Sequence, residues 1–156
     1  MRNLLLFITP FILIVQGCLE PTPSEILENN GYAINNLELT RAVSSDNSRM
    51  VELLFQTEVN TTSQGGALIL PFVVAHKNTT ILEIFLKNGA NPDIYRRDSL
   101  RTAIENRDEE AIRLLMRHGA DANRKNSSGA NAVGMVIKTD DTLLKILIEE
   151  GADYEP

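Results

Sequence analysis

The chain has little of the chemistry on which catalysis and nucleic-acid recognition depend. Its 156 residues include no tryptophan and only two histidines, and aromatic residues make up 5% of the total. Few aromatic side chains argue against a surface that stacks on bases or sugars, and two histidines limit the possible metal sites and catalytic bases. The formal net charge of −6 argues against a free-standing nucleic-acid binder. We therefore expect neither a nucleic-acid partner nor a metal site.

Sequence motifs of enzymes are also missing. The chain has no pair of histidines with metal-ligand spacing, no glycine-rich phosphate loop and no Gly-x-Ser-x-Gly motif. His118 directly precedes Gly119, where a hydrogen-bonding or cationic side chain suits the end of a helix. The carboxylates at 108–110 and 140–141 fall where helices start, so helix capping explains them better than acid–base catalysis. The sequence predicts no enzyme, no cofactor and no small-molecule substrate.

Cysteine occurs once, as Cys18, after a segment with the features of an export signal. Arg2 precedes an apolar run over residues 4–15 that is too short to span a bilayer comfortably. Residues 15–18, Val-Gln-Gly-Cys, resemble the bacterial lipobox, in which the cysteine is acylated and becomes the first residue after cleavage. A lone thiol has no intramolecular disulfide partner, and lipidation explains why it stands alone. The alternative is an ordinary small-residue cleavage site beside an incidental cysteine.

The lipobox resemblance implies an anchored protein. Residues 1–17 would be removed, and residues 18–24 would form the lipidated cysteine and a proline-rich spacer. More than one acyl chain gives a lasting membrane anchor. The residue after the cysteine is Leu19 and not an aspartate. In proteobacterial lipoproteins this resembles the default sorting to the outer membrane, not retention in the inner membrane. We expect a lipid-anchored protein of the bacterial cell envelope, facing the periplasm, with one folded domain over residues 25–156.

Internal repeats are the strongest signal in the chain. The tripeptide Gly-Ala-Asn/Asp begins at Gly89, Gly119 and Gly151, at intervals of 30 and 32 residues, which is a typical solenoid period. An apolar triplet lies at one fixed distance before each glycine. The triplets are Ile84-Phe85-Leu86, Leu114-Leu115-Met116 and Ile146-Leu147-Ile148, with Leu53-Leu54-Phe55 at the same distance before Glu58. Because Glu58 replaces the glycine, we expect the first repeat to end less cleanly.

A second, shorter helix is predicted upstream of each triplet. It has an apolar residue followed three positions later by a pair of small or β-branched residues, a spacing that keeps all three on one helical face. The four copies are Leu39 with Ala42-Val43, Leu70 with Val73-Val74, Leu100 with Ala103-Ile104, and Val133 with Val136-Ile137. Short polar turns separate the two helices of each unit at 45–47, 77–79, 107–108 and 139–141.

Over residues 36–153 this pattern resembles the ankyrin repeat family. The resemblance implies an all-α solenoid of about four helix-turn-helix repeats, at 36–60, 66–91, 97–121 and 129–153, joined by hairpin loops called fingers. Residues 98–121 and 128–153 match best. The family's threonine-proline-leucine-histidine motif is eroded to Asp98-Ser99-Leu100-Arg101 in the third repeat. The closing glycine is expected in the left-handed conformation, which it adopts without strain.

The two ends of the solenoid are expected to differ. Residues 26–31 look like the end of an outer helix without its inner partner, and they would cover the first apolar face. At the other end, the last apolar layer around Leu144 and Leu147 is expected to face solvent or a partner. Self-association of the protein would be the sign of such an exposed layer.

Members of the family generally bind proteins through their finger tips and the concave face of the inner helices. Two successive fingers carry Tyr95-Arg96-Arg97 and Arg124-Lys125, whereas the predicted outer helices carry acidic residues. The outer-helix acids are Glu52, Glu83, Glu109, Glu110, Glu149 and Glu150. We call the predicted partner-binding set the basic ridge; it consists of Tyr95, Arg96, Arg97, Arg101, Arg124 and Lys125, and we add His76 on an inner helix as a further candidate. Tyrosine and arginine are frequent at binding hot spots, so the ridge predicts a protein partner with an acidic surface.

Two alternatives to the basic ridge remain open at this stage. The cations could be solvated loop residues that balance the acidic face. The site could instead be the concave face around Ala75, His76, Glu105 and Asn106.

For function, the sequence favours a membrane-anchored, periplasm-facing protein-binding module. A specific form of this hypothesis is an immunity protein that neutralises a periplasm-targeted toxic effector. The alternative is a structural or protective envelope lipoprotein that scaffolds a periplasmic complex.

Overall fold

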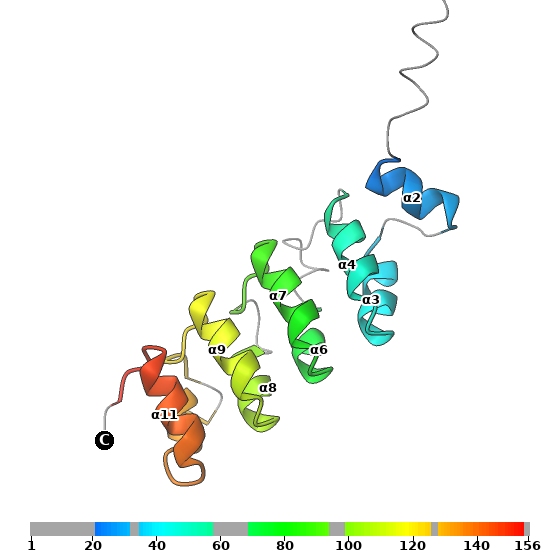
Figure 1. Ribbon diagram of the computed structural model, residues 1–156. Helices are drawn as coiled ribbons and strands as arrows, with labels where there is room; N and C mark the ends of the chain where they lie inside the picture. Colours follow the sequence, from blue (N-terminus) through cyan, green and yellow to red (C-terminus); the bar gives the residue numbers. More distant parts are fainter. Residues whose placement is uncertain (1–20, 32–34, 58–68, 94–98, 126–127, 155–156) are drawn as a thin grey trace, which may run out of the picture.

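The computed structural model describes residues 21–31, 35–57, 69–93, 99–125 and 128–154, and the regular secondary structure in these ranges is helical. The helices are α2 (Pro23–Asn29), α3 (Asn36–Ser44), α4 (Ser48–Phe55), α6 (Leu70–Ala75), α7 (Thr79–Lys87), α8 (Ser99–Glu105), α9 (Glu109–Arg117), α10 (Ala132–Val136) and α11 (Asp141–Glu149). Figure 1 shows α2 by itself at the start of a row of antiparallel helix pairs, with α4, α7, α9 and α11 in one layer and the inner helices behind. The predicted all-α solenoid is confirmed.

The core runs along the row between the two layers. The middle residue of each predicted outer triplet is completely buried. These residues are Leu54, Phe85, Leu115 and Leu147. The predicted faces of the inner helices are buried as well, except that Ile137 lies only partly inside. One apolar stripe per helix therefore faces the partner layer, as the 3.6-residue period requires.

The prediction that Leu147 belongs to an exposed last layer is wrong. Leu147 is equivalent to Leu115 and points into the core, where none of its surface is exposed. The apolar residues on the outward side of α11 are instead Leu144, which is half-buried, and Ile148, which is 43% exposed. The error came from treating Leu144 and Leu147 as one layer. Three residues apart, they differ by about 60° around the helix, which is enough to place Leu147 in the core and Leu144 at the edge of the outward side.

Each outer helix begins at an asparagine or aspartate that caps it. Asn47, Asn78, Asp108 and Asp140 each accept a hydrogen bond from the backbone N–H three residues later, at distances of 3.0 to 3.1 Å. Such a cap satisfies a backbone donor that has no partner within the helix. The carboxylates of Asp108 and Asp140 are therefore helix caps, as predicted.

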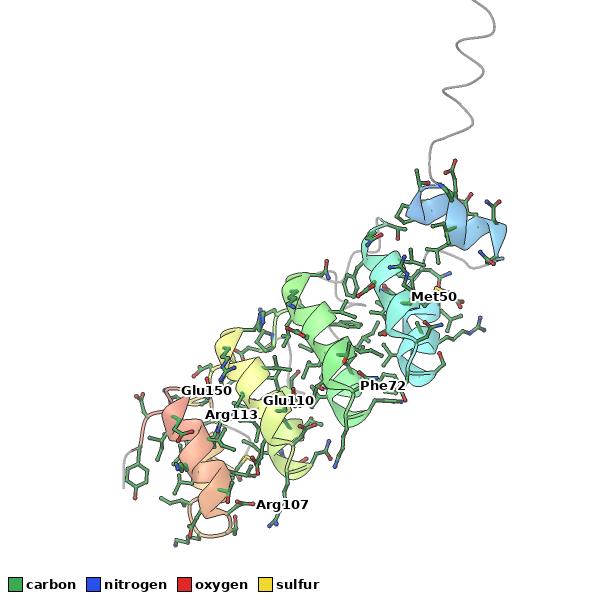
Figure 2. The ribbon with its side chains drawn as sticks, viewed as in Figure 1. Met50, Phe72, Arg107, Glu110, Arg113 and Glu150 are labelled. Atoms are coloured by element: carbon green, nitrogen blue, oxygen red, sulfur yellow. The ribbon has the colours of Figure 1, made fainter. Side chains whose placement is uncertain are left out.

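The turns between inner and outer helices contain a residue with positive φ in the first three repeats. These residues are Asp46, Lys77 and Arg107, with φ between 52° and 55°. The fourth turn, at 137–140, is one residue longer than the others and contains no residue with positive φ. Arg107, at the tip of its turn in Figure 2, reaches the next repeat, where its Nε lies 3.6 Å from Oδ2 of Asp140.

The outer helices α7, α9 and α11 each close at a left-handed glycine, as predicted. The φ values of Gly89, Gly119 and Gly151 are +82°, +88° and +101°. The alanine that follows then donates its N–H back to the buried middle residue, as from Ala120 to the carbonyl of Leu115 at 3.0 Å. This bond satisfies a carbonyl that would otherwise lack a partner at the helix end. Glu58 lies outside the described residues, so the expectation for the first repeat stays a prediction.

Helix α2 covers the first apolar face, as predicted for a half-repeat. It packs against α4 and buries Leu27 completely. Thr22 and Glu25 form a capping box at its start, in which each side chain accepts a hydrogen bond from the other's backbone N–H. Gly31, with φ of +77°, follows α2 in the same way that Gly119 follows α9.

Candidate protein-binding surface

The fingers are tied to the next repeat by side chains at equivalent positions. The carboxylate of Asp93 accepts the N–H of Asp121 at 3.0 and 3.2 Å. Asn123 occupies the same place one repeat later, where its Oδ1 accepts the N–H of Asp153 at 3.2 Å and its Nδ2 donates to the Asp153 carboxylate at 2.7 Å. These bonds hold each finger in a fixed position along the stack.

Sequence reasoning missed Asp93 and Asn123, although a signal for them exists. Each lies four residues after the closing glycine of its repeat, at Gly89 and Gly119. A recurring asparagine or aspartate at a fixed place in a loop is typical of a side chain that bonds backbone groups.

Arg124 extends this connection between fingers. Its Nη1 donates to the backbone carbonyl of Asp93 at 2.6 Å, so the second finger reaches back to the first. Lys125, the next residue, is exposed. One guanidinium nitrogen of Arg124 is therefore held by a hydrogen bond to the neighbouring finger.

Two residues of the basic ridge lie together. Arg101 of α8 and Arg124 of the finger line one small depression, together with the acidic Asp121. Arg101 also pairs with Glu105, whose Oε1 lies 2.8 Å from its Nε, and this pair offsets part of its charge. Tyr95, Arg96 and Arg97 lie outside the described residues, so their part in the ridge stays a prediction.

His76 stands apart from this depression. It is exposed at the end of α6, and its ring centroid lies 4.1 Å from that of Phe72. Its Nδ1 lies 2.9 Å from the Phe72 carbonyl oxygen. Of the other concave candidates, Ala75 is also exposed, and the Asn106 carbonyl accepts a hydrogen bond from Lys77 at 3.2 Å. The structure thus places His76 on the inner-helix side and does not join it to Arg124.

The outer face carries more positive charge than the sequence interpretation counted. Several of its acids pair with lysine or arginine on the same helix. The pairs are Glu52 with Arg49 at 3.3 Å, Glu83 with Lys87 at 2.7 Å, and Glu149 with Lys145 at 3.8 Å. Charge is consequently less segregated between the outer helices and the fingers than we expected. In each pair the cation lies one helical turn from its acid.

Glu150 forms a cluster with two arginines of the neighbouring repeat. Its Oε1 lies 3.1 Å from Arg113 and 2.9 Å from Arg117, and only 12% of its side chain is exposed. Figure 2 shows Arg113 and Glu150 between α9 and α11. The hydrogen bond from Arg117, helped by the one from Arg113, lowers the pKa of Glu150 although desolvation raises it. The cluster holds the last repeat to the one before it.

The described residues show neither a membrane-spanning helix nor a metal-binding cluster. Within them, no helix combines the length and the apolar character needed to cross a bilayer. No three histidine, cysteine, aspartate or glutamate side chains gather there in a group that could hold a metal ion.

Comparison with known proteins agrees with the repeat pattern. A family model of ankyrin repeats, in three copies, matches residues 39–126, which is more than half of the chain. An ankyrin repeat protein of fowlpox virus (strain NVSL) is 31% identical over 104 residues, covering 64% of this chain and 24% of the viral protein. The chain thus spans about a quarter of the length of that relative. No solved structure matches.

The coarse function follows from the family, because ankyrin repeats are protein-interaction modules that typically carry no catalytic site. The structure shows capped helix pairs that close at left-handed glycines, and the family model matches more than half of the residues; the chain belongs to the ankyrin repeat family.

Proposed function

We propose that this chain is a membrane-anchored, periplasm-facing module that binds one partner protein through the basic ridge and catalyses no reaction. The observation that carries the proposal is the meeting of Arg101 and Arg124 at one depression, beside the exposed Lys125. These cations stand on a chain whose formal net charge is −6. A local positive surface on an acidic protein favours a partner with a complementary acidic surface.

The finger geometry supports a role for Arg124 in recognition. Its guanidinium group has N–H donors in a rigid plane that matches carboxylate geometry. The bond to the Asp93 carbonyl restricts the conformations of its side chain. A restricted side chain loses less conformational entropy when it binds, so more of the interaction energy remains for affinity.

The proposed location rests on the lipobox at residues 15–18. An acylated Cys18 would anchor the repeats at the bacterial envelope, with the outer membrane as the expected place. A specific form of the proposal is an immunity protein that neutralises a toxic effector delivered to the periplasm. Export, an anchor and a scaffold dedicated to binding all suit that role.

The alternative is a structural or protective envelope lipoprotein that scaffolds a periplasmic complex. The same export signal and anchor support it. Gene neighbourhood separates the two, because an immunity gene is expected beside a gene for a secreted lipase, nuclease or peptidoglycan hydrolase.

The test is affinity capture from detergent-solubilised envelopes of the cells that produce the protein. The wild-type chain is compared with an Arg124→Glu, Lys125→Glu double variant. The control is Arg49→Glu with Lys87→Glu, which makes the same change in net charge at exposed cations of the outer helices α4 and α7. We expect one partner to be captured by the wild type and the control and to be lost from the ridge variant. Equal capture by all three chains would contradict the proposed site.

A further inference from the structure

A second surface of the protein lies on the outward side of α11. Three large apolar side chains are well exposed among the described residues: Leu37 at 61%, Ile148 at 43% and Tyr154 at 48%. Two of the three therefore lie in or just after α11. Ile148 and the half-buried Leu144 form an apolar strip, and Asp141, Lys145 and Glu149 border it. We call these five residues of α11 the α11 face; Figure 1 shows α11 at the end of the row.

The α11 face has the geometry of a surface that binds helices. Leu144 and Ile148 occupy the places that Ile112 and Met116 occupy in α9. Arg113, next to Ile112, and Arg117, next to Met116, bind the following repeat through Glu149 and Glu150. That side of α9 therefore packs against the next helix pair, and Ile112 is completely buried there. On α11 the equivalent residues, Leu144 and Ile148, are at least partly exposed to solvent.

At the opposite end of the stack, the described residues of α2 face solvent mainly with polar side chains. Helix α2 covers that end, buries Leu27 and presents Glu25, Glu28 and Asn29 to solvent. Head-to-tail association would therefore place an apolar strip against carboxylates and an amide, at a cost in desolvation. The α11 face of a second copy offers apolar side chains of the same kind.

We propose that the α11 faces of two copies pack against each other around a two-fold axis, with the two α11 helices antiparallel. An axis beside residue 146 places Leu144 of each copy opposite Ile148 of the other. Two-fold pairing of one surface with itself is the most common symmetry of soluble oligomers. This inference is independent of the proposed function.

The charges on the face complement each other in this arrangement. Along α11, acid, base and acid follow at four-residue intervals in Asp141, Lys145 and Glu149. Antiparallel pairing about residue 146 brings Lys145 of one copy within side-chain reach of Glu149 of the other. Lys145 is 77% exposed and its contact with Glu149 of its own helix is long, at 3.8 Å, so it can turn toward the second copy.

The test measures the mass of the full chain by sedimentation in a nonionic detergent, over a range of protein concentrations. Ile148→Lys places a charge in the apolar strip, and we expect it to raise the dimer dissociation constant by about tenfold or more. Lys145→Glu, at an exposed position that does not contribute to the core, should also weaken the dimer because it sets like charges against each other. The matched control is Leu37→Lys, the same kind of change at an exposed apolar residue of α3.

The expected result is a wild-type dimer that Leu37→Lys preserves and that both α11 variants dissociate. Circular dichroism checks that each variant is folded, and Lys145→Glu decides the outcome if Ile148→Lys does not fold. A monomeric wild type at all concentrations would overturn the proposal. So would a dimer that persists in the α11 variants, or one that Leu37→Lys disrupts equally, because either result places the contact elsewhere.

Discussion

Gly119 shows how a single residue sets the geometry of a repeat. Its φ of +88° lies in the left-handed region, and a Cβ atom added there would meet nothing within 4 Å. A side chain at this position therefore costs backbone strain and not a steric clash with neighbours. This strain would destabilise the turn at the end of α9, in which the N–H of Ala120 donates to the carbonyl of Leu115 at 3.0 Å.

Gly119→Val should therefore destabilise the fold by about 1 kcal/mol or more, which corresponds to a fall in Tm of about 4 °C or more. Thermal unfolding followed by circular dichroism measures the effect. Gly119→Asn is the matched comparison, because asparagine enters the left-handed region more readily than a β-branched residue. Two results would show that backbone strain is not the cause. One is a Gly119→Val variant with the Tm of the wild type, and the other is a Gly119→Asn variant whose Tm falls as much as that of Gly119→Val.

Single residues also show where prediction from sequence stopped. The caps at Asp108 and Asp140 and the closing glycines could be predicted, because the chemistry of helix ends is local. Other contacts join residues in different repeats. Asp93 accepts a hydrogen bond from the N–H of Asp121, and Arg113 pairs with Glu149 and Glu150. Predicting them requires the side-by-side register of neighbouring repeats, which the spacing of motifs gives only approximately.

At the scale of elements, helices α9 and α11 are joined by apolar packing and by the Glu150 cluster. Glu150 is largely buried and takes hydrogen bonds from Arg113 and Arg117, which lower its pKa from the usual range of glutamate. A carboxyl whose pKa is lower in the folded state stabilises the fold at neutral pH. That contribution is lost as the pH falls through the lowered pKa, because protonation removes the charge in the folded state too.

Glu150→Gln should therefore lower the Tm at pH 7, where the wild-type carboxylate is charged and paired. The difference between wild type and variant should shrink as the pH is lowered below the ordinary pKa of glutamate, about 4.3. Glu109→Gln, an exposed residue in the first turn of α9, is the control and should change the Tm less. A Tm difference that stays constant with pH would mean that the charge of Glu150 does not hold α11 to α9.

The helix pairs themselves were predictable from the sequence, since the apolar spacing that defines each helix also defines the side that it buries. The exceptions have physical causes. Helix α10 ends at Val136, earlier in its repeat than the other inner helices, so Ile137 lies in the turn to α11 and is only partly buried. The placement of Leu147 failed because exposure at the end of a stack depends on which side of the last helix faces outward.

At the scale of the whole molecule, the anchor and the recognition surface that we propose lie in different parts of the chain. The proposed anchor lies at Cys18, and the proposed recognition surface lies around Arg124, in the finger between the third and fourth repeats. Changes at one should leave the other intact. Location and binding can therefore be tested separately.

Replacing Cys18 by serine should abolish membrane anchoring, because acylation needs the thiol and more than one acyl chain gives a lasting anchor. Membrane fractionation of cells that express the wild type and the Cys18→Ser variant measures this. Gln16→Ser, a change beside the cysteine that keeps the thiol, is the control and should still sediment with membranes. A Cys18→Ser variant that stays with membranes after a salt wash would contradict the lipoprotein hypothesis.

The most direct test of the account is a kinetic titration of the captured partner at several salt concentrations. The account predicts that Arg124→Glu with Lys125→Glu slows association and reduces its dependence on salt, since rim charges act mainly on the association rate. Ala75→Glu with His76→Glu, on the concave face, should change binding less. The opposite result would contradict the account: a ridge variant that binds as tightly and as fast as the wild type, while the concave variant abolishes binding.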